Sequence, residues 1–203
     1  MLKYVSKSPH RNLLEEKLRI LSPQLKGTIL DVGSKNRPYD HLLEGKVIAI
    51  DLKPEGKGVE KGDIANLDFP QDYFDGVLST EVLEYIKEPQ KAVSEVHRVL
   101  KKDSVALIST PFMYKFHHDF LRFTKDYLND LFSKFTLVEI YPIGNFYTII
   151  LDILRDKIIH LRPAVLRYIL YLPYFFLVLF IKPSQILIKD QNFVSGYLVC
   201  ARK

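Results

Sequence analysis

Cysteine is almost absent from this 203-residue chain, and several kinds of site are excluded with it. The single cysteine, Cys200, excludes an internal disulfide framework and fits a reducing compartment. No cluster of cysteines and histidines has the spacing of a zinc site, and no lysine- and arginine-rich run is of the nucleic-acid-binding type. We therefore expect no metal site and no nucleic-acid partner.

The chain also has little net charge and no long apolar run. Its formal charge of +5 allows an anionic partner or a membrane surface without requiring either. The first 18 residues contain no continuous apolar core of signal-peptide length. The nearest approach to a membrane segment, 168–181, has 14 residues and is interrupted by Pro173, whereas a spanning helix needs about 20. We expect a cytoplasmic protein, with peripheral membrane contact left open.

Short apolar runs alternate with helical patterns along most of the chain. Continuous apolar runs suit parallel strands that are covered on both faces. Strands are predicted at 28–32 and 46–51, then in a short third segment before Asp63, and at 73–80, 104–111, 135–144 and 196–203. Helices are predicted near 13–21, 89–102 and 124–135, the last with Thr124 as its N-cap. This alternation predicts one α/β domain over residues 1–203, built on an open sheet.

Acidic residues follow the first three predicted strands, at the edge where open α/β sheets bind their ligands. Asp31 and Gly33 end the first strand, and Asp51 ends the second. A carboxylate at the position of Asp51 can accept two hydrogen bonds from a ribose diol. Asp63, beside the apolar Ile64, follows the third strand and is a candidate for recognising an adenine. The alternative for Asp51 and Asp63 is a solvated turn or loop.

The segments ILDVG, VIAID and GDI, and above all residues 74–111, resemble the class I S-adenosylmethionine-dependent methyltransferases of the type 11/UbiE-like group. In 74–111 an FDGV strand, an EVLEYI turn, a P-x-x-A-x-x-E-x-x-R-V-L-K helix and a strand ending in TP follow in order. The resemblance covers about residues 25–143 and the last strand. It implies a Rossmann-like seven-stranded mixed sheet with an antiparallel last strand and helices on both faces. It also implies S-adenosyl-L-methionine as cofactor, and methyl transfer to a small-molecule, lipid or glycan acceptor.

The resemblance assigns a role to each position that matches the family's motifs. The first motif would lie under the methionine part of the cofactor, and the residues after the second and third strands would hold its ribose and adenine. The cofactor-binding positions implied in this way are Asp31, Gly33, Ser34, Asp51, Leu52, Asp63, Ile64, Ser79 and Thr80. Glu81, next along the chain, would face the acceptor.

The first motif departs from the family pattern of acid-x-Gly-x-Gly-x-Gly. Only Gly33 is retained, while Lys35 and Arg37 stand at the later glycine positions. S-adenosylmethionine has no phosphate, so it needs less of the close backbone approach that glycines give to a pyrophosphate. Asn36 tolerates a left-handed conformation better than most residues, and we expect it to shape this turn. A nicotinamide-dependent oxidoreductase would want all three glycines. A non-catalytic, membrane-associated or scaffold module is the alternative function.

A polar run after the fifth predicted strand is similar to an H-x-D-x-x-R run that such methyltransferases often carry there. Methyl transfer from a sulfonium is an in-line displacement, and a base is needed only where the nucleophile must lose a proton. His117 or His118 is a candidate for that base, and Asp119 and Arg122 are candidates for binding the acceptor. The alternative is that Asp119 and Arg122 pair to fix the loop.

A long apolar segment separates the last two predicted strands. Residues 145–190 carry helical patterns that we expect to be broken at Pro163, Pro173 and Pro183. We interpret the segment as an insertion within the single domain. Three roles stay open: a helical cap over the acceptor pocket, a membrane-surface or lipid-substrate element, and a homodimer interface.

Overall fold

A seven-stranded sheet forms the centre of the computed structural model, which describes residues 7–115, 117–187 and 192–203, with the side chains of 180–187 excepted. The strands lie in the order β3-β2-β1-β4-β5-β7-β6. They are β1 Thr28–Val32, β2 Lys46–Asp51, β3 Val59–Lys61, β4 Phe74–Thr80, β5 Leu100–Pro111, β6 Leu137–Ile143 and β7 Gly196–Arg202. Strands β1 to β5 pair in parallel, and β7 is antiparallel to both β5 and β6. The predicted mixed sheet with an antiparallel last strand is confirmed.

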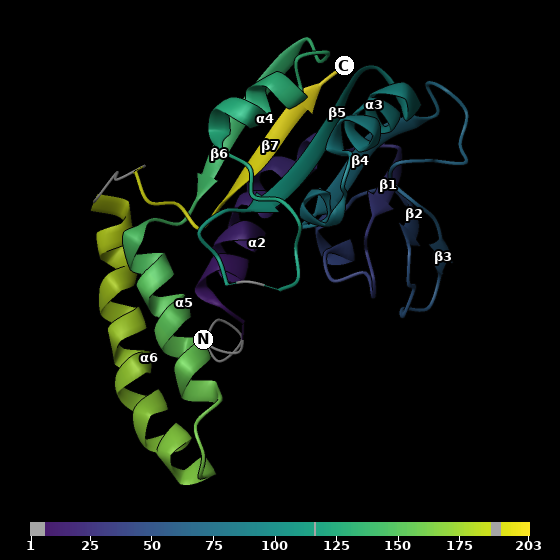
Figure 1. Ribbon diagram of the computed structural model, residues 1–203. Coiled ribbons are helices and arrows are strands. Elements are labelled where there is room, and N and C mark those ends of the chain that lie inside the picture. The colour runs from purple at the N-terminus through teal and green to yellow at the C-terminus, as the bar shows by residue number, and fades with distance from the viewer. Residues whose placement is uncertain (1–6, 116, 188–191) are drawn as a thin grey trace.

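Helices cover both faces of this sheet (Figure 1). Helix α2 (Pro9–Leu21) packs on one face, while α3 (Pro89–Val99) and α4 (Lys125–Leu131) lie on the other. The strands serve both faces because successive side chains point to opposite sides. In β4, for example, Val77 contacts the α3 side and Leu78 the α2 side. Short 3-10 turns complete the body at Ser22–Gln24, Asp40–Leu42 and Leu83–Tyr85.

Side-chain caps fix where several helices begin. The Thr124 hydroxyl accepts a hydrogen bond from the Tyr127 amide at 3.3 Å, so the predicted cap of α4 is confirmed. Ser8 caps α2 through the Arg11 amide at 3.3 Å. Asn145 and Thr148 form a capping box at the start of α5 (Phe146–Ile159). The cap at Ser8 fixes the first turn of α2, which carries residues of the candidate site.

The predicted insertion is a helical hairpin of α5 and α6 (Ala164–Leu187) that projects beyond the sheet (Figure 1). The expected breaks at Pro173 and Pro183 are wrong, because α6 runs through both prolines, and only Pro163 lies in the turn. Packing of Tyr174 and Val178 on α5 outweighs the hydrogen bond that a proline removes from a helix. Residues 188–190 of the insertion lie outside the described part of the chain.

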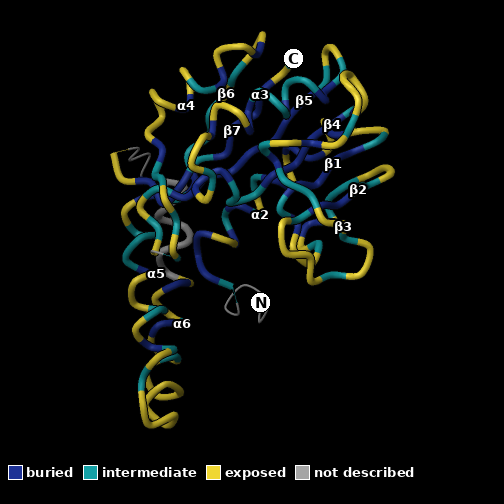
Figure 2. Tube along the Cα trace, turned by 45° about the vertical axis from the view of Figure 1, so that its right-hand side comes forward, coloured by how far each residue is buried: buried dark blue, intermediate teal, exposed yellow. Residues whose placement is uncertain are grey.

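Burial differs sharply between the body and this hairpin. Figure 2 shows buried residues concentrated in the sheet and exposed residues at the far end of the hairpin. Residues 162–170, around the turn and the start of α6, are all exposed. Among the residues that the structure describes, no helix is both long and apolar enough to cross a membrane.

Candidate active site

A cavity of about 560 Å³ opens at the carboxyl ends of β1, β2 and β4, where a parallel sheet places its ligands. Its volume lies within the range of about 300–1,000 Å³ that is typical of small-molecule sites. The loops after these strands line it, together with Arg11 from α2 and His117 from the loop after β5. The predicted site residues that line it are Gly33, Ser34, Asp51, Leu52, Ile64, Thr80, Glu81 and His117.

Gly33 makes the turn by which the chain leaves β1. Its φ of 72° lies in the left-handed region, and a Cβ atom there would stand 2.2 Å from Cγ2 of Val82. The amides of Gly33 and Ser34 both donate to the carbonyl of Ile50, at 2.8 and 3.2 Å. The turn is therefore locked against β2, and any larger residue at position 33 would collide with the chain after β4.

The next two left-handed residues of this loop are Lys35 and Arg37, with φ of 50° and 57°. These are the two positions at which the family carries its later glycines. Asn36, which tolerates a left-handed conformation, does not take it here. A left-handed conformation costs a non-glycine residue about 1–2 kcal/mol. Hydrogen bonds offset that cost, because the Lys35 carbonyl accepts from the amides of Glu55 and Gly56 at 3.1 and 2.8 Å.

Asp51 stands at the end of β2 with its carboxylate fixed by the backbone. One oxygen accepts from the Lys35 amide at 2.9 Å and the other from the Lys53 amide at 2.7 Å. A carboxylate has about four acceptor sites, so two remain for a ligand in the cavity. Leu52 and Ile64 line the same end and give it an apolar wall. The arrangement can hold a diol next to an apolar ring.

Three predicted cofactor residues do not line the cavity. Asp31 is buried in the sheet, where burial, the largest cause, raises the pKa of its carboxyl to about 7. Ser79 is also buried in the sheet. Asp63 turns its carboxylate to the Ala65 amide at 2.9 Å. A direct contact between these side chains and a cofactor stays a prediction.

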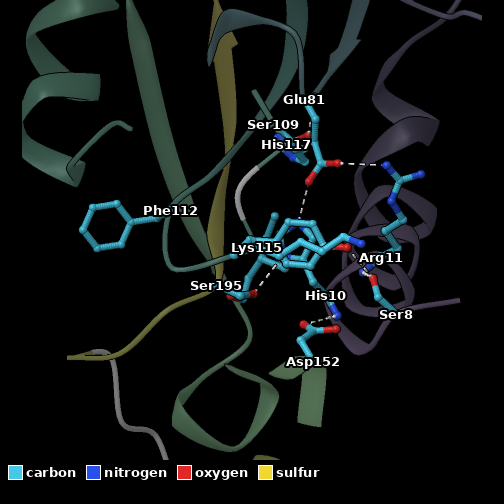
Figure 3. A network of polar contacts seen from close by, with 12 residues as sticks. Ser8, His10, Arg11, Glu81, Ser109, Phe112, Lys115, His117, Asp152 and Ser195 are labelled. Carbon is cyan, nitrogen blue, oxygen red and sulfur yellow. Dashed lines mark hydrogen bonds and ion pairs between the residues drawn. The ribbon is translucent and has the colours of Figure 1, made fainter. Parts of the chain in front are cut away.

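The opposite end of the cavity is built around Glu81, directly after β4. Its carboxylate contacts His10 Nε2 at 2.6 Å and Arg11 Nη2 at 3.5 Å (Figure 3). Burial raises the pKa of Glu81, but the hydrogen bond and charge of His10 and the charge of Arg11 outweigh it. The net result is a pKa below the usual value of a glutamate. Glu81 is thus an almost buried carboxylate with two basic partners.

His10 links Glu81 to the start of β7. Its Nδ1 lies 2.7 Å from the Ser195 hydroxyl, which itself donates to the Ile143 carbonyl at 2.8 Å. Since that hydroxyl proton is committed, Nδ1 must carry the proton of the contact with Ser195. The short contact between Nε2 and the Glu81 carboxyl is then a single hydrogen bond that shares one proton. The ring also stacks on Tyr114, with centroids 4.4 Å apart.

The inserted hairpin contacts this network through α5. The backbone amide of His10 donates to Asp152 Oδ2 at 3.2 Å (Figure 3). Burial is the main cause that raises the pKa of Asp152 to about 7. Further along α5, Asp156 lies 3.2 Å from Lys115 Nζ in the loop after β5. The insertion is therefore attached to His10 and to the loop after β5, near the Glu81 end of the cavity.

Only one of the two histidines predicted as a base reaches the cavity. His117 lines it, with Nδ1 at 3.1 Å from the Tyr85 hydroxyl. Burial is the main cause that lowers the pKa of His117, so the ring is neutral near pH 7 and can accept a proton. His118 is exposed and does not line the cavity.

Asp119 and Arg122 pair with each other, as the loop-fixing alternative predicts. Arg122 also donates to the carbonyls of Phe112, Tyr114 and Lys115, at 2.7, 3.1 and 3.2 Å. Neither side chain lines the cavity, so their role toward an acceptor stays a prediction. Together they hold in place the loop that presents His117.

A family model described as a methyltransferase domain matches residues 30–108, which include the end of β1 and all of β2, β3, β4 and α3. This match, together with the fold of similar solved structures, supports a class I S-adenosylmethionine-dependent methyltransferase domain of the type 11 group. The matched residues contain most of the cavity wall, whereas α2, the loop after β5 and the hairpin lie outside them.

Similar proteins extend the comparison to nearly the whole methyltransferase domain. A methyltransferase from Archaeoglobus fulgidus described as SAM-dependent has 17% identity and a TM-score of 0.62, over 95% of this chain and 94% of its own. Phosphoethanolamine N-methyltransferase 2 of Haemonchus contortus, in complex with S-adenosyl-L-methionine, has 16% identity and a TM-score of 0.62, over 95% of this chain and 52% of its own. At these low sequence identities the similarity shows a shared fold alone.

Sequence similarity to a curated protein is confined to a short stretch. The chain is 38% identical over 56 residues to 2-methyl-6-phytyl-1,4-hydroquinone methyltransferase 1 of Oryza sativa subsp. japonica. The stretch is 28% of this chain and 17% of the rice protein, so the chain spans about a sixth of that relative. The activity and acceptor of the relative are therefore not transferred with the similarity.

The cavity of this methyltransferase domain fits S-adenosyl-L-methionine. Asp51 would offer its two remaining acceptor positions to a ribose, and Leu52 and Ile64 would lie against an adenine. Ser34 lines the cavity beside the Gly33 turn, and its buried hydroxyl has no hydrogen-bond partner among the residues described. An unpartnered buried hydroxyl is costly, and a polar ligand group at this end would satisfy it.

No local sequence pattern marked His10 or Ser195 as part of the site. His10 contacts Glu81 across 71 positions and Ser195 across 185 positions of the chain. His10 lies on a helix outside the motifs of the methyltransferase family. Only the three-dimensional fold brings these groups together.

Proposed function

We propose that this chain transfers a methyl group from S-adenosyl-L-methionine to a small-molecule, lipid or glycan acceptor. The observation that carries the proposal is one cavity with two unlike ends. Asp51, Leu52 and Ile64 form an end suited to a nucleoside, and Glu81, Tyr85 and His117 form a polar end. The bound cofactor would supply an electrophilic methyl group on a sulfonium.

The residues of the nucleoside end would act by positioning. The Gly33 turn and the Asp51 carboxylate are both fixed by backbone hydrogen bonds, so little order has to be gained on binding. In-line displacement depends on the alignment of the reacting atoms. A rigid cradle at this end would hold the reactive group at the Glu81 end of the cavity.

His117 would accept a proton where the acceptor is a hydroxyl. Burial keeps the pKa of His117 below 6.5, so the neutral ring persists to mildly acidic pH. Glu81 is committed to His10 and Arg11 and would orient the acceptor rather than take its proton. For an amine acceptor, which carries its own lone pair when neutral, His117 would be dispensable for the chemical step.

The names of the similar proteins include both a lipid acceptor and a polar acceptor, so the proposal includes both classes. The rice proteins are named for an acceptor with a phytyl chain, and the Haemonchus contortus enzyme for phosphoethanolamine. The second candidate function is a non-catalytic scaffold, suggested by the loss of two motif glycines. It is disfavoured because Lys35 and Arg37 preserve the left-handed turn that those glycines would make.

Calorimetry with S-adenosylhomocysteine tests the proposal directly. We expect a dissociation constant within about 1 μM–1 mM, the range of typical Michaelis constants. The absence of binding at millimolar ligand by a folded sample would leave the scaffold function in its place. With binding established, transfer of a labelled methyl group to phytyl-hydroquinone, phosphoethanolamine and sugar acceptors would identify the acceptor class.

A further inference from the structure

Helix α6 carries two apolar stripes, of which only one packs against other residues that the structure describes. Tyr171, Tyr174 and Val178 face α5 and pack with Leu151 and Ile158. This cluster is separate from the two large clusters of the sheet. A helix that is apolar all round is normally enclosed by protein or lipid, and α5 encloses one side only.

The second stripe, which we call the outer stripe, consists of Val165, Tyr168, Ile169, Leu172 and Phe176. These residues recur at helical spacing and are each half exposed or more, up to 79% for Tyr168. They do not alternate with acidic residues, as they would on a solvated helix face. More than half of the exposed large apolar side chains of the described residues lie between 153 and 179. Such a concentration indicates an interaction surface.

Charge is segregated along the hairpin. The acidic side chains, Asp152 and Asp156, are held against the body by His10 and Lys115. No acidic residue occurs from 157 to 187 in the sequence. Exposed cations, by contrast, surround the far turn, namely Lys157, Arg162 and Arg167. The outer stripe is therefore bordered by positive charge alone.

We propose that the outer stripe of α6 and the cationic turn dock on the surface of an anionic lipid bilayer. The apolar side chains would enter the boundary between headgroups and acyl chains, and Lys157, Arg162 and Arg167 would meet the lipid phosphates. The helix would lie on the surface rather than cross it. A second copy of the hairpin is a poorer occupant, because its own cationic turn offers no charge complementarity.

The position of the hairpin connects this surface to the cavity of the domain. Helix α5 lies between α6 and the body, so the outer stripe points away from the sheet (Figure 1). The same α5 contacts His10 through Asp152. Docking would therefore hold the acceptor end of the cavity close to the bilayer, whether or not the acceptor itself is a lipid.

Vesicle flotation tests the proposal with the full chain. The probes are vesicles of pure phosphatidylcholine and vesicles that also contain phosphatidylglycerol, each at low and high salt. We expect flotation with the anionic vesicles and its loss at high salt, because the Debye length falls from about 30 Å at 0.01 M to about 3 Å at 1 M. Equal binding to both vesicles, or to neither, would overturn the proposal.

Matched variants separate the stripe and the charges from non-specific effects. The double variant Ile169→Glu, Leu172→Glu should lower vesicle partitioning about a hundredfold, since two apolar side chains that would be partly buried in the bilayer are lost. Ile20→Glu, at a residue 74% exposed on α2, is the control and should bind as wild type. Arg162→Gln and Arg167→Gln should each cost about fivefold. Lys57→Gln and Lys61→Gln, exposed cations outside the hairpin, should cost nothing.

Two further measurements keep the outcome decisive. Binding of S-adenosylhomocysteine by each variant shows that the body remains folded and reports on the methyltransferase function separately from docking. Light scattering without lipid reports the oligomeric state. A dimer that the Ile169→Glu and Leu172→Glu pair dissociates, together with no flotation of the wild type, would assign the outer stripe to a second copy and refute the lipid surface.

Discussion

The two ends of the cavity are built on opposite principles. At the proposed nucleoside end, Asp51 and the Gly33 turn are fixed by backbone hydrogen bonds with neighbouring loops, and the ion pair of Lys35 and Glu55 is exposed. At the proposed acceptor end, the almost buried Glu81 is fixed by side chains of α2. The first end is held by the main chain near each motif, and the second by side chains from distant elements.

This difference predicts where the domain tolerates change. Backbone contacts survive most side-chain substitutions, so the nucleoside end can lose two glycines and keep its shape. A buried network fails when one member is removed, because the remaining groups are left unpaired in a low dielectric. The acceptor end should therefore dominate the effects of substitution on stability.

The largest expected effect comes from removing the charge of Glu81. Glu81→Ala should lower the free energy of unfolding by about 3 kcal/mol, because it leaves the fully buried His10 without its carboxylate partner. Glu55→Ala removes the exposed pair with Lys35 at the other end and should cost about 0–1 kcal/mol. Urea denaturation measures both. Equal effects would show that the two ends are not built differently.

The next effect is a pH dependence at Glu84, a buried residue of the turn after β4. Burial is the main cause that raises its pKa from 4.5 to about 8, so the folded state keeps a proton that the unfolded state has lost. Stability therefore falls as the pH rises from about 4.5 to about 8. Glu84→Gln, which cannot titrate, should match wild type at pH 4 and exceed it on the order of 3 kcal/mol at pH 8.

The control for Glu84 is built into the molecule. Asp31 and Asp152, each with a pKa raised to about 7, act in the same direction and are present in both proteins. Their contributions cancel when the free energy of unfolding of wild type is subtracted from that of Glu84→Gln at each pH. Parallel curves for wild type and Glu84→Gln would contradict a protonated Glu84.

At the nucleoside end the main effect should fall on ligand affinity. Asp51→Ala should weaken S-adenosylhomocysteine binding by about 10- to 100-fold, since hydrogen bonds to a charged group contribute about 1.5–3 kcal/mol. Asp63→Ala is the matched variant, because its carboxylate caps its own turn and does not line the cavity. Calorimetry that showed the greater loss for Asp63→Ala would move the nucleoside away from Asp51.

The smallest effect tests the left-handed turn. Lys35→Gly should stabilise the fold by about 0.5–1 kcal/mol, because glycine adopts a φ of 50° without the steric cost. Asn36→Gly, one residue along and without a positive φ, should be neutral or destabilising. Thermal denaturation of the two variants measures the difference. If Asn36→Gly raised the melting temperature and Lys35→Gly did not, the backbone strain would not lie at Lys35.

The same contrast explains which features the sequence could predict. Strands β1, β2, β4 and β5, the cap at Thr124 and the contribution of Asp51 to the cavity depend on residues close together in the chain. The intrinsic preference of Asn36 does not reveal which residues of this loop are left-handed. The hydrogen bonds to the Lys35 carbonyl, which come from residues about 20 positions further along the chain, favour that conformation at Lys35.

Long-range contacts account for the other differences. A proline pattern cannot show that α6 continues through Pro173, since the packing of Tyr174 and Val178 on α5 stabilises it. His10 belongs to the site only because α2 packs across the ends of β4 and β7. Both features need a folded chain, because each rests on residues that local periodicity treats as unrelated.

The pairing of β6 with β7 has a consequence for how this domain can be re-engineered or can diverge. Ile143 at the end of β6 lies opposite Gly196 at the start of β7, so the chain leaves and re-enters the sheet at neighbouring points. In topology, the whole segment between them is an enlarged hairpin loop. Lengthening a loop costs only about 0.6 kcal/mol per doubling. Segments of very different size can therefore be exchanged at this junction while the strand register stays the same.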